Sequence, residues 1–431
     1  MRHLLLAAAT TLACAAPALS ENRIDLIRPD APALATRGTH PVGVRAQDFT
    51  DADRIDVIAA AQGGTPTADR TLRTEIWYPA AEGTEPGTTY DTILRDGVTP
   101  TTLTGSAARD AAPAQGSFPL VILSHGYPGN RYLMSHLAEN LASKGYVVVA
   151  ADHPESTYDD QQAFPSTLVN RAVDQRFLLD SMAALEGDLG AATDADHAAV
   201  VGYSMGGYGA LIFGGAGLSR TALERTEPAG FAPPAGLLDR LAAGGEEHTA
   251  LVDPRVKAVV AIAPWGRQHE FWDAGGLNDL TKPLLLVSGS DDDVSVYDAI
   301  RQIYDQTTAT TRHLLTFDHA NHNAAAPIPA PAEAWAMSES LGRAPFDHYA
   351  DPVWDSVRMN NILQHFTTAF LDIHLKGDSG KADYLNLIPD AGDGVWSLDD
   401  DGTPDAAHTY WLGFPDRSAK GLMFETKPSG Q

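Results

Sequence analysis

The stretch HAAVVGYSMGGYGALIF, residues 197–213, decides the fold of this chain. Residues 198–201 are small and β-branched, which predicts a buried strand, and the Ala-, Leu- and Gly-rich part from Met205 onward predicts a helix. Between them lies the G-x-S-x-G sequence GYSMG, residues 202–206. A chain that turns sharply from strand to helix strains its central residue, and Cβ atoms two positions before and after would collide. The two glycines therefore predict a tight turn that lifts the Ser204 hydroxyl clear of the backbone.

This turn also opens a helix. The first N–H groups of a helix have no acceptor within it, and they favour nearby negative charge. A developing oxyanion beside Ser204 could therefore be stabilised there. We interpret the stretch as a nucleophile elbow, against the plainer alternative of a Gly-rich turn with a bystander serine.

Short, continuous apolar runs surround this elbow, and runs of this kind are typical of strands buried on both faces of a parallel sheet. They lie at residues 118–124, 145–151, 198–201, 256–263 and 283–288, with a further strand at 312–317. Helical segments are expected between or after them, at 131–143, 173–185, 205–213 and 296–304. The pattern predicts a doubly wound α/β fold with helices on both faces and its site at the carboxyl ends of the strands.

The predicted domain organisation is one α/β domain over residues 21–431, preceded by a signal peptide at residues 1–20. Residues 21–70 are expected to be an arm, mostly irregular, with one short strand near 42–46. An alternating strand is expected at 71–78 and an elaborated loop at 80–117. The Pro- and Gly-rich segment 214–253, with a short helix at 237–241, is the probable lid insertion, and residues 324–347 are a second candidate lid.

A serine hydroxyl is a poor nucleophile near neutral pH, so it needs a base and a third group that orients the base. In this architecture the chain order is serine, acid, histidine. The strand at 283–288 runs into the loop Gly289–Ser290–Asp291–Asp292–Asp293. We choose Asp292 as the acid because the third residue after the glycine is expected to turn toward the site. Asp291 remains the alternative, since both lie on the same short turn.

The base is expected after the last strand, which is followed by the segment DHANHN, residues 318–323. Two histidines compete. We choose His322, because a loop of a few residues is needed to carry the imidazole back over Ser204. His319 lies closer to the strand end and is expected to be structural.

An oxyanion hole needs two backbone donors, one from the residue after the nucleophile. Met205 would supply the first. The second is expected from the loop HGYPGN, residues 125–130, where Gly126 lets the backbone bend and the Tyr127 N–H is the chosen donor. We expect His125 to be structural, fixing this loop by hydrogen bonds.

Composition excludes several classes of function. The net charge of −26 repels phosphate backbones, which argues against nucleic-acid binding. With 44% hydrophobic and 20% charged residues, the chain can bury a large core. The segment 397–402 resembles a calcium loop in part, but Ser397 and His408 stand where Asp and Glu are expected, and no zinc motif lies on a helix. We expect no metal and no cofactor.

The first residues resemble an export signal. Arg2 and His3 precede an apolar run from Leu4 to Leu19, and small residues precede an expected cleavage after Ser20. This run is short for a membrane span, so we expect a secreted or periplasmic protein without an integral membrane segment. The rival interpretation is a lipoprotein anchor at Cys14, the one cysteine in the sequence.

Several motifs together resemble α/β-hydrolases of the dienelactone-hydrolase-like and platelet-activating-factor-acetylhydrolase-like group. They are SHGYPGNR at 124–131, ADHPESTYDD at 151–160, VGYSMGGYGA at 201–210, LLLVSGSDDDV at 284–294 and HANHN at 319–323, with HPVGVR, EIWYPA and the predicted helix at 357–378. The resemblance implies an esterase-type serine hydrolase with Ser204, Asp292 and His322 as its triad. Dienelactone hydrolases proper use a cysteine nucleophile, whereas this chain has serine, which puts lactone chemistry in doubt.

These observations predict an exported hydrolase of carboxylic esters, acting on a small-molecule or lipid-like ester. A peptidase or amidase, or a cutinase-like polyester hydrolase, would use the same triad. A non-catalytic binding module is the alternative from a different class. The natural ester and the oligomeric state are left open.

Overall fold

The computed structural model describes residues 21–431. The predicted signal peptide at residues 1–20 and the alternative anchor at Cys14 lie outside the described residues. No helix of the described part is both long enough and apolar enough to cross a bilayer.

One large sheet organises the described residues and contains ten of their strands, in the order β13-β12-β11-β10-β9-β7-β8-β3-β2-β6. From β12 to β8 every neighbouring pair is parallel, which confirms the predicted mostly parallel sheet. The strands are β2 (Val42–Ile55), β3 (Thr67–Pro79), β6 (Ala107–Arg109), β7 (Phe118–Ser124), β8 (Val147–Asp152), β9 (Thr193–Tyr203), β10 (Val256–Ile262), β11 (Leu284–Gly289), β12 (Arg312–Phe317) and β13 (Leu422–Lys427).

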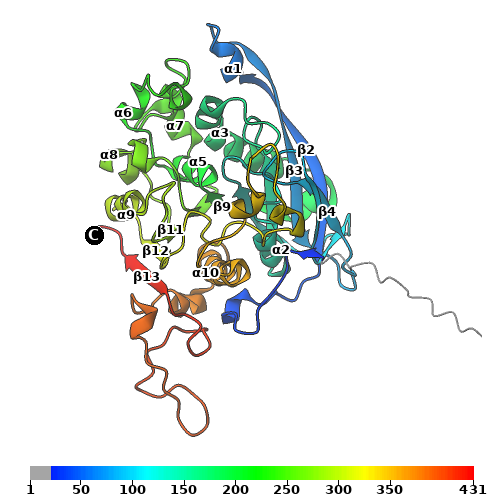
Figure 1. Cartoon of the computed structure of the whole chain (residues 1–431), viewed down its shortest axis with the longest axis vertical. Coiled ribbons are helices and arrows are strands. Elements are labelled where there is room, and N and C mark those ends of the chain that lie inside the picture. The colour runs from blue at the N-terminus through cyan, green and yellow to red at the C-terminus, as the bar shows by residue number, and fades with distance from the viewer. Residues whose placement is uncertain (1–20) are drawn as a thin grey trace, which may run out of the picture.

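Helices cover both faces of this sheet (Figure 1). Alternate residues of one strand enter different cores: Val121 of β7 belongs to the core that contains side chains of α2 and α10, whereas Leu120 belongs to the core that contains side chains of α3, α5 and α9. Continuous apolar strands are therefore buried on both sides, as their sequence predicts. The helices are α1 (Val57–Ala60), α2 (Ser135–Ser143), α3 (Phe164–Ala183), α4 (Gly187–Ala192), α5 (Met205–Gly214), α6 (Arg220–Leu223), α7 (Glu246–Leu251), α8 (Ala274–Asn278), α9 (Tyr297–Gln306) and α10 (Ser356–Lys376).

The prediction of a loop at residues 80–117 is wrong. It contains β6 of the large sheet and the hairpin of β4 (Thr89–Ile93) and β5 (Pro100–Thr104), which joins β1 (Asn22–Arg23) in a separate three-stranded sheet. These strands are short, and few of their residues are apolar, so the sequence carries little periodicity. Tertiary burial of Tyr90 and Leu103 is what selects the strand conformation.

The strand expected near residues 42–46 is also much longer than predicted, because β2 continues to Ile55. It pairs with β3 along a hairpin that reaches past the rest of the sheet and carries α1 at its tip (Figure 1). The outer part of β2 is exposed and polar, so its order comes from backbone pairing with β3 and not from an apolar face.

The segment 214–253 packs onto the core rather than standing apart from it. It contains α6, α7 and short 3-10 turns, and its apolar side chains Leu218, Leu237 and Leu241 are buried with the helices of that face. Phe231 is the residue of this segment that lines the pocket described below.

Several histidines are buried in the structure, among them His136, His153, His313 and His365. Burial lowers the pKa of the first three to about 4 and that of His365 to about 3. Each of these side chains is therefore neutral in the folded protein near pH 7. Once the chain unfolds, each regains an ordinary pKa of about 6.5.

We therefore expect stability to fall as the pH drops from about 6.5 to about 4, because only the unfolded chain gains these protons. Each histidine contributes a slope of up to about 1.4 kcal/mol per pH unit. Thermal denaturation followed by circular dichroism across this range checks the prediction. Replacing the buried His313 with Gln is expected to flatten the profile. A melting temperature independent of pH would contradict it.

Candidate active site

Ser204 lies at the turn between β9 and α5, in the strained backbone conformation expected of it, with φ 53° and ψ −112°. A Cβ atom on Gly202 would collide with the backbone of Gly206, and one on Gly206 would collide with the carbonyl of Ser124. The Ser204 backbone is held on both sides, by its N–H on the Ile262 carbonyl (2.8 Å) and its carbonyl on the Trp265 N–H (3.1 Å). The steric reason for both glycines is thus visible in the structure.

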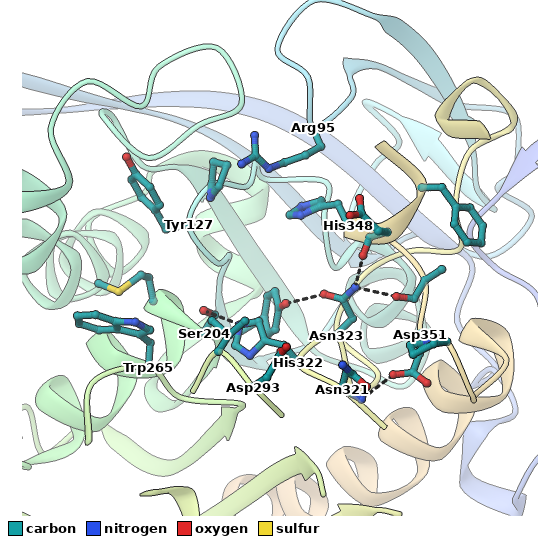
Figure 2. Close-up of a pocket in the computed structure, with 18 of the residues that line it drawn as sticks. Arg95, Tyr127, Ser204, Trp265, Asp293, Asn321, His322, Asn323, His348 and Asp351 are labelled. Atoms are coloured by element: carbon teal, nitrogen blue, oxygen red, sulfur yellow. Dashed lines mark hydrogen bonds between the residues drawn. The ribbon is translucent and has the colours of Figure 1, made fainter. Parts of the chain in front are cut away.

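The structure brings Ser204, His322 and Asp292 together in one chain of hydrogen bonds. Figure 2 shows the contact between Ser204 and His322 at the pocket. The Ser204 Oγ lies 3.0 Å from His322 Nε2, and His322 Nδ1 lies 3.0 and 3.1 Å from the two oxygens of Asp292. A nitrogen facing a carboxylate carries the proton, so Nε2 is left to accept from the serine hydroxyl. This arrangement can withdraw a proton from Ser204.

Asp292 is itself held in place. Its side chain is buried, and its Oδ1 accepts the backbone N–H groups of Val294 (2.9 Å) and Ser295 (2.8 Å). The neighbouring Asp291 points elsewhere and lies 3.4 Å from the exposed His319. The two acids and two histidines that the sequence left in competition are therefore paired separately, one pair beside Ser204 and one on the surface.

The two backbone groups predicted to hold an oxyanion flank Ser204. Met205 is the first residue of α5, so its N–H has no acceptor within the helix. The loop that carries Tyr127 passes directly over the serine. A Cβ on Gly126 would lie only 3.3 Å from the Cβ of Ser204. Tyr127, Ser204 and Met205 all line the same pocket.

His125 lies beneath this loop and is buried, as its expected structural role requires. Its Nδ1 bonds the Gly126 carbonyl (2.7 Å), and its Nε2 accepts the backbone N–H of His153 (3.2 Å). Burial lowers its pKa well below the ordinary value, and the nearby Arg171 lowers it further. A neutral His125 can therefore hold both contacts.

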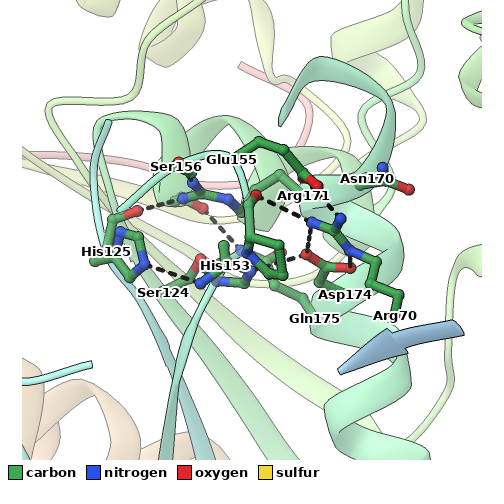
Figure 3. Close-up of polar contacts among 12 residues, drawn as sticks. Arg70, Ser124, His125, His153, Glu155, Ser156, Asn170, Arg171, Asp174 and Gln175 are labelled. Carbon is green, nitrogen blue, oxygen red and sulfur yellow. Dashed lines mark hydrogen bonds and ion pairs between the residues drawn. The ribbon is translucent and has the colours of Figure 1, made fainter. Parts of the chain in front are cut away.

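Behind His125 lies a buried polar cluster that the sequence did not predict (Figure 3). Ser124 Oγ lies 2.9 Å from His153 Nε2, and His153 Nδ1 lies 3.0 Å from Asp174. Arg171 donates to the carbonyl of His125, which ties α3 to the loop over Ser204. The residues of this cluster come from segments far apart in the chain, so no local spacing in the sequence identifies them.

Asp174 is the centre of this cluster. It accepts from Arg70 (2.9 and 3.1 Å) and Arg54 (3.2 Å) as well as His153. Burial alone would raise the pKa of its carboxyl, but these neighbours hold it well below its usual range. Although Ser124, His153 and Asp174 have the composition of a triad, none lines the pocket, and we interpret them as support for the loop.

The pocket over Ser204 has a volume of about 880 Å³. Aromatic side chains from distant segments form much of its wall: Tyr127, Phe164, Phe231, Trp265 and Phe346. Residues 343–352 line much of the rest, so part of the second candidate lid does lie at the site. Sequence reasoning placed Tyr127 and the two candidate lid segments at this site, and it missed Phe164, Trp265 and Arg95.

Within residues 21–431, no three side chains of His, Cys, Asp or Glu gather in a way that could hold a metal ion. The candidate calcium segment at 397–402 forms an ordinary turn, in which Asp399 accepts the backbone N–H groups of Asp401 (3.1 Å) and Thr403 (3.0 Å).

Comparison with known families supports the architecture. Residues 119–215, which run from β7 through the elbow and α5, match the family model described as alpha/beta hydrolase fold. The solved structure of a ferulic acid esterase from Streptomyces cinnamoneus aligns with a TM-score of 0.58 and 23% identity, covering 83% of this chain and 94% of that one. This chain has an α/β-hydrolase fold.

Two curated proteins match part of this chain. Cutinase est2 of Thermobifida alba is 27% identical over 208 residues, which are 48% of this chain and 53% of the relative. Cutinase est1 of the same organism is 24% identical over 208 residues, 48% of this chain and 54% of the relative. The chain thus spans about half the length of the curated relatives it matches.

Proposed function

We propose that this protein is a serine hydrolase that cleaves carboxylic esters through an acyl-enzyme, with Ser204, His322 and Asp292 as its triad. The observation that carries the proposal is the hydrogen-bonded chain from Ser204 through His322 to Asp292, at the floor of an aromatic pocket. The names of the relatives, two cutinases and a ferulic acid esterase, support the same class of reaction.

In the proposed mechanism Ser204 Oγ attacks the ester carbonyl while His322 Nε2 takes its proton. Asp292 keeps the imidazole in the correct tautomer and balances the charge that forms on it. The N–H groups of Met205 and Tyr127 hold the tetrahedral oxyanion. His322 then protonates the leaving alcohol, and it activates a water molecule that releases the acyl group and regenerates Ser204. This chemistry calls for no cofactor.

The substrate range follows from the pocket wall. We propose that Phe231, from the segment 214–253 that was predicted to be a lid, limits the space beside Trp265 and restricts the acyl chain to short or medium length. The two rings pack at 5.3 Å between centroids. A cutinase-like action on polyesters is the second candidate, which the names of the two relatives favour.

We also propose that the protein is exported, which the sequence of residues 1–20 supports. The narrower resemblance to the dienelactone-hydrolase-like group stays a proposal.

Two measurements test the function. The first is hydrolysis of p-nitrophenyl esters from acetyl to palmitoyl, where we expect an optimum at short or medium chains. A flat profile would contradict the closed pocket, and clearing of an insoluble polyester film would favour the open one. The second is labelling with a fluorophosphonate, followed by mass spectrometry of the modified peptide. We expect the label on Ser204. No labelling would favour the binding module, and faster cleavage of aminoacyl amides than of matched esters would favour the amidase.

A further inference from the structure

The turn between β4 and β5 delivers a cation to the pocket. Arg95 lies in this turn and lines the same cavity as Ser204. The turn is closed by Leu94 N–H on the Thr99 carbonyl (2.8 Å), and the carboxylate of Asp96 accepts the N–H (2.9 Å) and hydroxyl (2.6 Å) of Thr99. The backbone N–H of Arg95 donates to the hydroxyl of the buried Tyr349 (3.1 Å). These hydrogen bonds therefore fix the backbone position of Arg95.

The guanidinium of Arg95 has no partner of its own. Among residues 21–431 no carboxylate lies within ion-pair distance of it, and its side chain makes no hydrogen bond. The other arginine of the pocket, Arg343, is already paired with Asp347. Removing a cation from water without an anion beside it costs free energy of folding. An anion bound to Arg95 would offset this cost. Burial lowers the pKa of Arg95, with Arg343 adding to the effect.

The unpaired positive charge of the pocket lies on the side opposite Ser204. Arg95 lies across the cavity from Ser204 and His322, close to Tyr127 and His348 (Figure 2). Burial lowers the pKa of His348 to about 3, so that side chain brings no second charge. Of the acids in the pocket, Asp347 is paired with Arg343, Asp351 accepts the backbone N–H groups of Asn321, Val353 and Trp354, and Asp293 lies on the opposite side, beside His322.

We propose that Arg95 is an anion subsite and that the substrate is an ester that also carries a free carboxylate. With the ester carbonyl at Ser204, the carboxylate would reach across the aromatic wall to the guanidinium, which suits carboxylates through its paired donors. Half-esters of dicarboxylic acids and carboxyaryl esters have this chemistry. The inference rests on the proposed function and narrows it.

The test compares matched substrates that differ only in charge. On the acyl side these are mono-p-nitrophenyl adipate and p-nitrophenyl hexanoate, and on the alcohol side para-butyryloxybenzoate and its methyl ester. We expect Arg95→Gln to lower the anionic-to-neutral ratio of kcat/KM about 10- to 100-fold for the pair that reaches the subsite. Arg95→Lys is expected to keep part of the preference. Arg417→Gln, the control, is expected to hold the ratio within about threefold, because this arginine is exposed and lies outside the pocket.

Binding of adipate itself separates this inference from the proposed function. We expect adipate to raise the melting temperature of the wild-type protein and not that of Arg95→Gln, with the rise shrinking at high salt. If no ester is cleaved but adipate stabilises only proteins that keep Arg95, the subsite stands and the esterase proposal falls. If hexanoate is cleaved, and neither the substrate ratios nor the adipate shift depends on Arg95, the subsite is wrong and the esterase proposal stands.

Discussion

Replacing Ser204 by Ala is expected to lower kcat for p-nitrophenyl ester hydrolysis by roughly 10⁴-fold or more, the scale seen when a triad nucleophile is removed. The substitution deletes the atom that forms the acyl-enzyme and leaves the oxyanion donors and the pocket in place. Steady-state and burst-phase kinetics on purified protein measure the effect. The fluorophosphonate label should disappear in the same variant.

Ser204→Gly provides a matched control for this prediction. Glycine adopts φ 53° without the strain that a side chain suffers there, so this variant is expected to be as inactive as Ser204→Ala but more stable by about 1 kcal/mol. The comparison separates loss of chemistry from loss of fold. If Ser204→Ala kept full activity, the elbow would not carry the nucleophile, and the mechanism proposed above would fail.

The second large effect is expected at the acid. Asp292→Asn should lower kcat by about 10³- to 10⁴-fold, because an amide in place of the carboxylate no longer holds the proton on His322 Nδ1 and leaves the imidazole in the wrong tautomer. The same change at Asp291, one residue away, should alter kcat by no more than about threefold, since that side chain faces the exposed His319.

The two Asn variants form a closely matched pair. Each exchanges one carboxylate for an amide on the same turn, so a general effect of charge on the acidic surface would appear in both. Circular dichroism and melting curves are needed alongside the kinetics, because Asp292 also caps the N–H groups of Val294 and Ser295. Equal losses in both variants would contradict the assignment of Asp292.

The proposed site also depends on side chains that never touch the pocket. Arg171 and His153 bind the backbone and ring of His125, and the loop that follows crosses over Ser204. An oxyanion hole works only when its donors are already in place before charge develops. In the mechanism proposed above, the buried cluster around Asp174 holds the loop of Tyr127 in place from outside the pocket.

The sequence by itself determined the central architecture of this protein. Continuous apolar runs predict a sheet buried on both faces because burial imposes their composition locally, strand by strand. Gly202 and Gly206 mark the elbow for a local steric reason, which the collisions at these two positions make plain. Ser204, Asp292 and His322 each follow a strand of the parallel sheet, in that chain order, and they are expected near one another because the carboxyl ends of parallel strands share an edge.

The tertiary structure alone decided what surrounds these residues. It separated Asp292 from Asp291, paired His153 with Asp174, and turned the expected loop at 80–117 into a hairpin that presents Arg95 to the pocket. Contacts of this kind join residues far apart in the chain, such as Arg70 and Asp174 at a separation of 104. They leave no periodicity in a single sequence, because the partners meet only after the sheet has assembled.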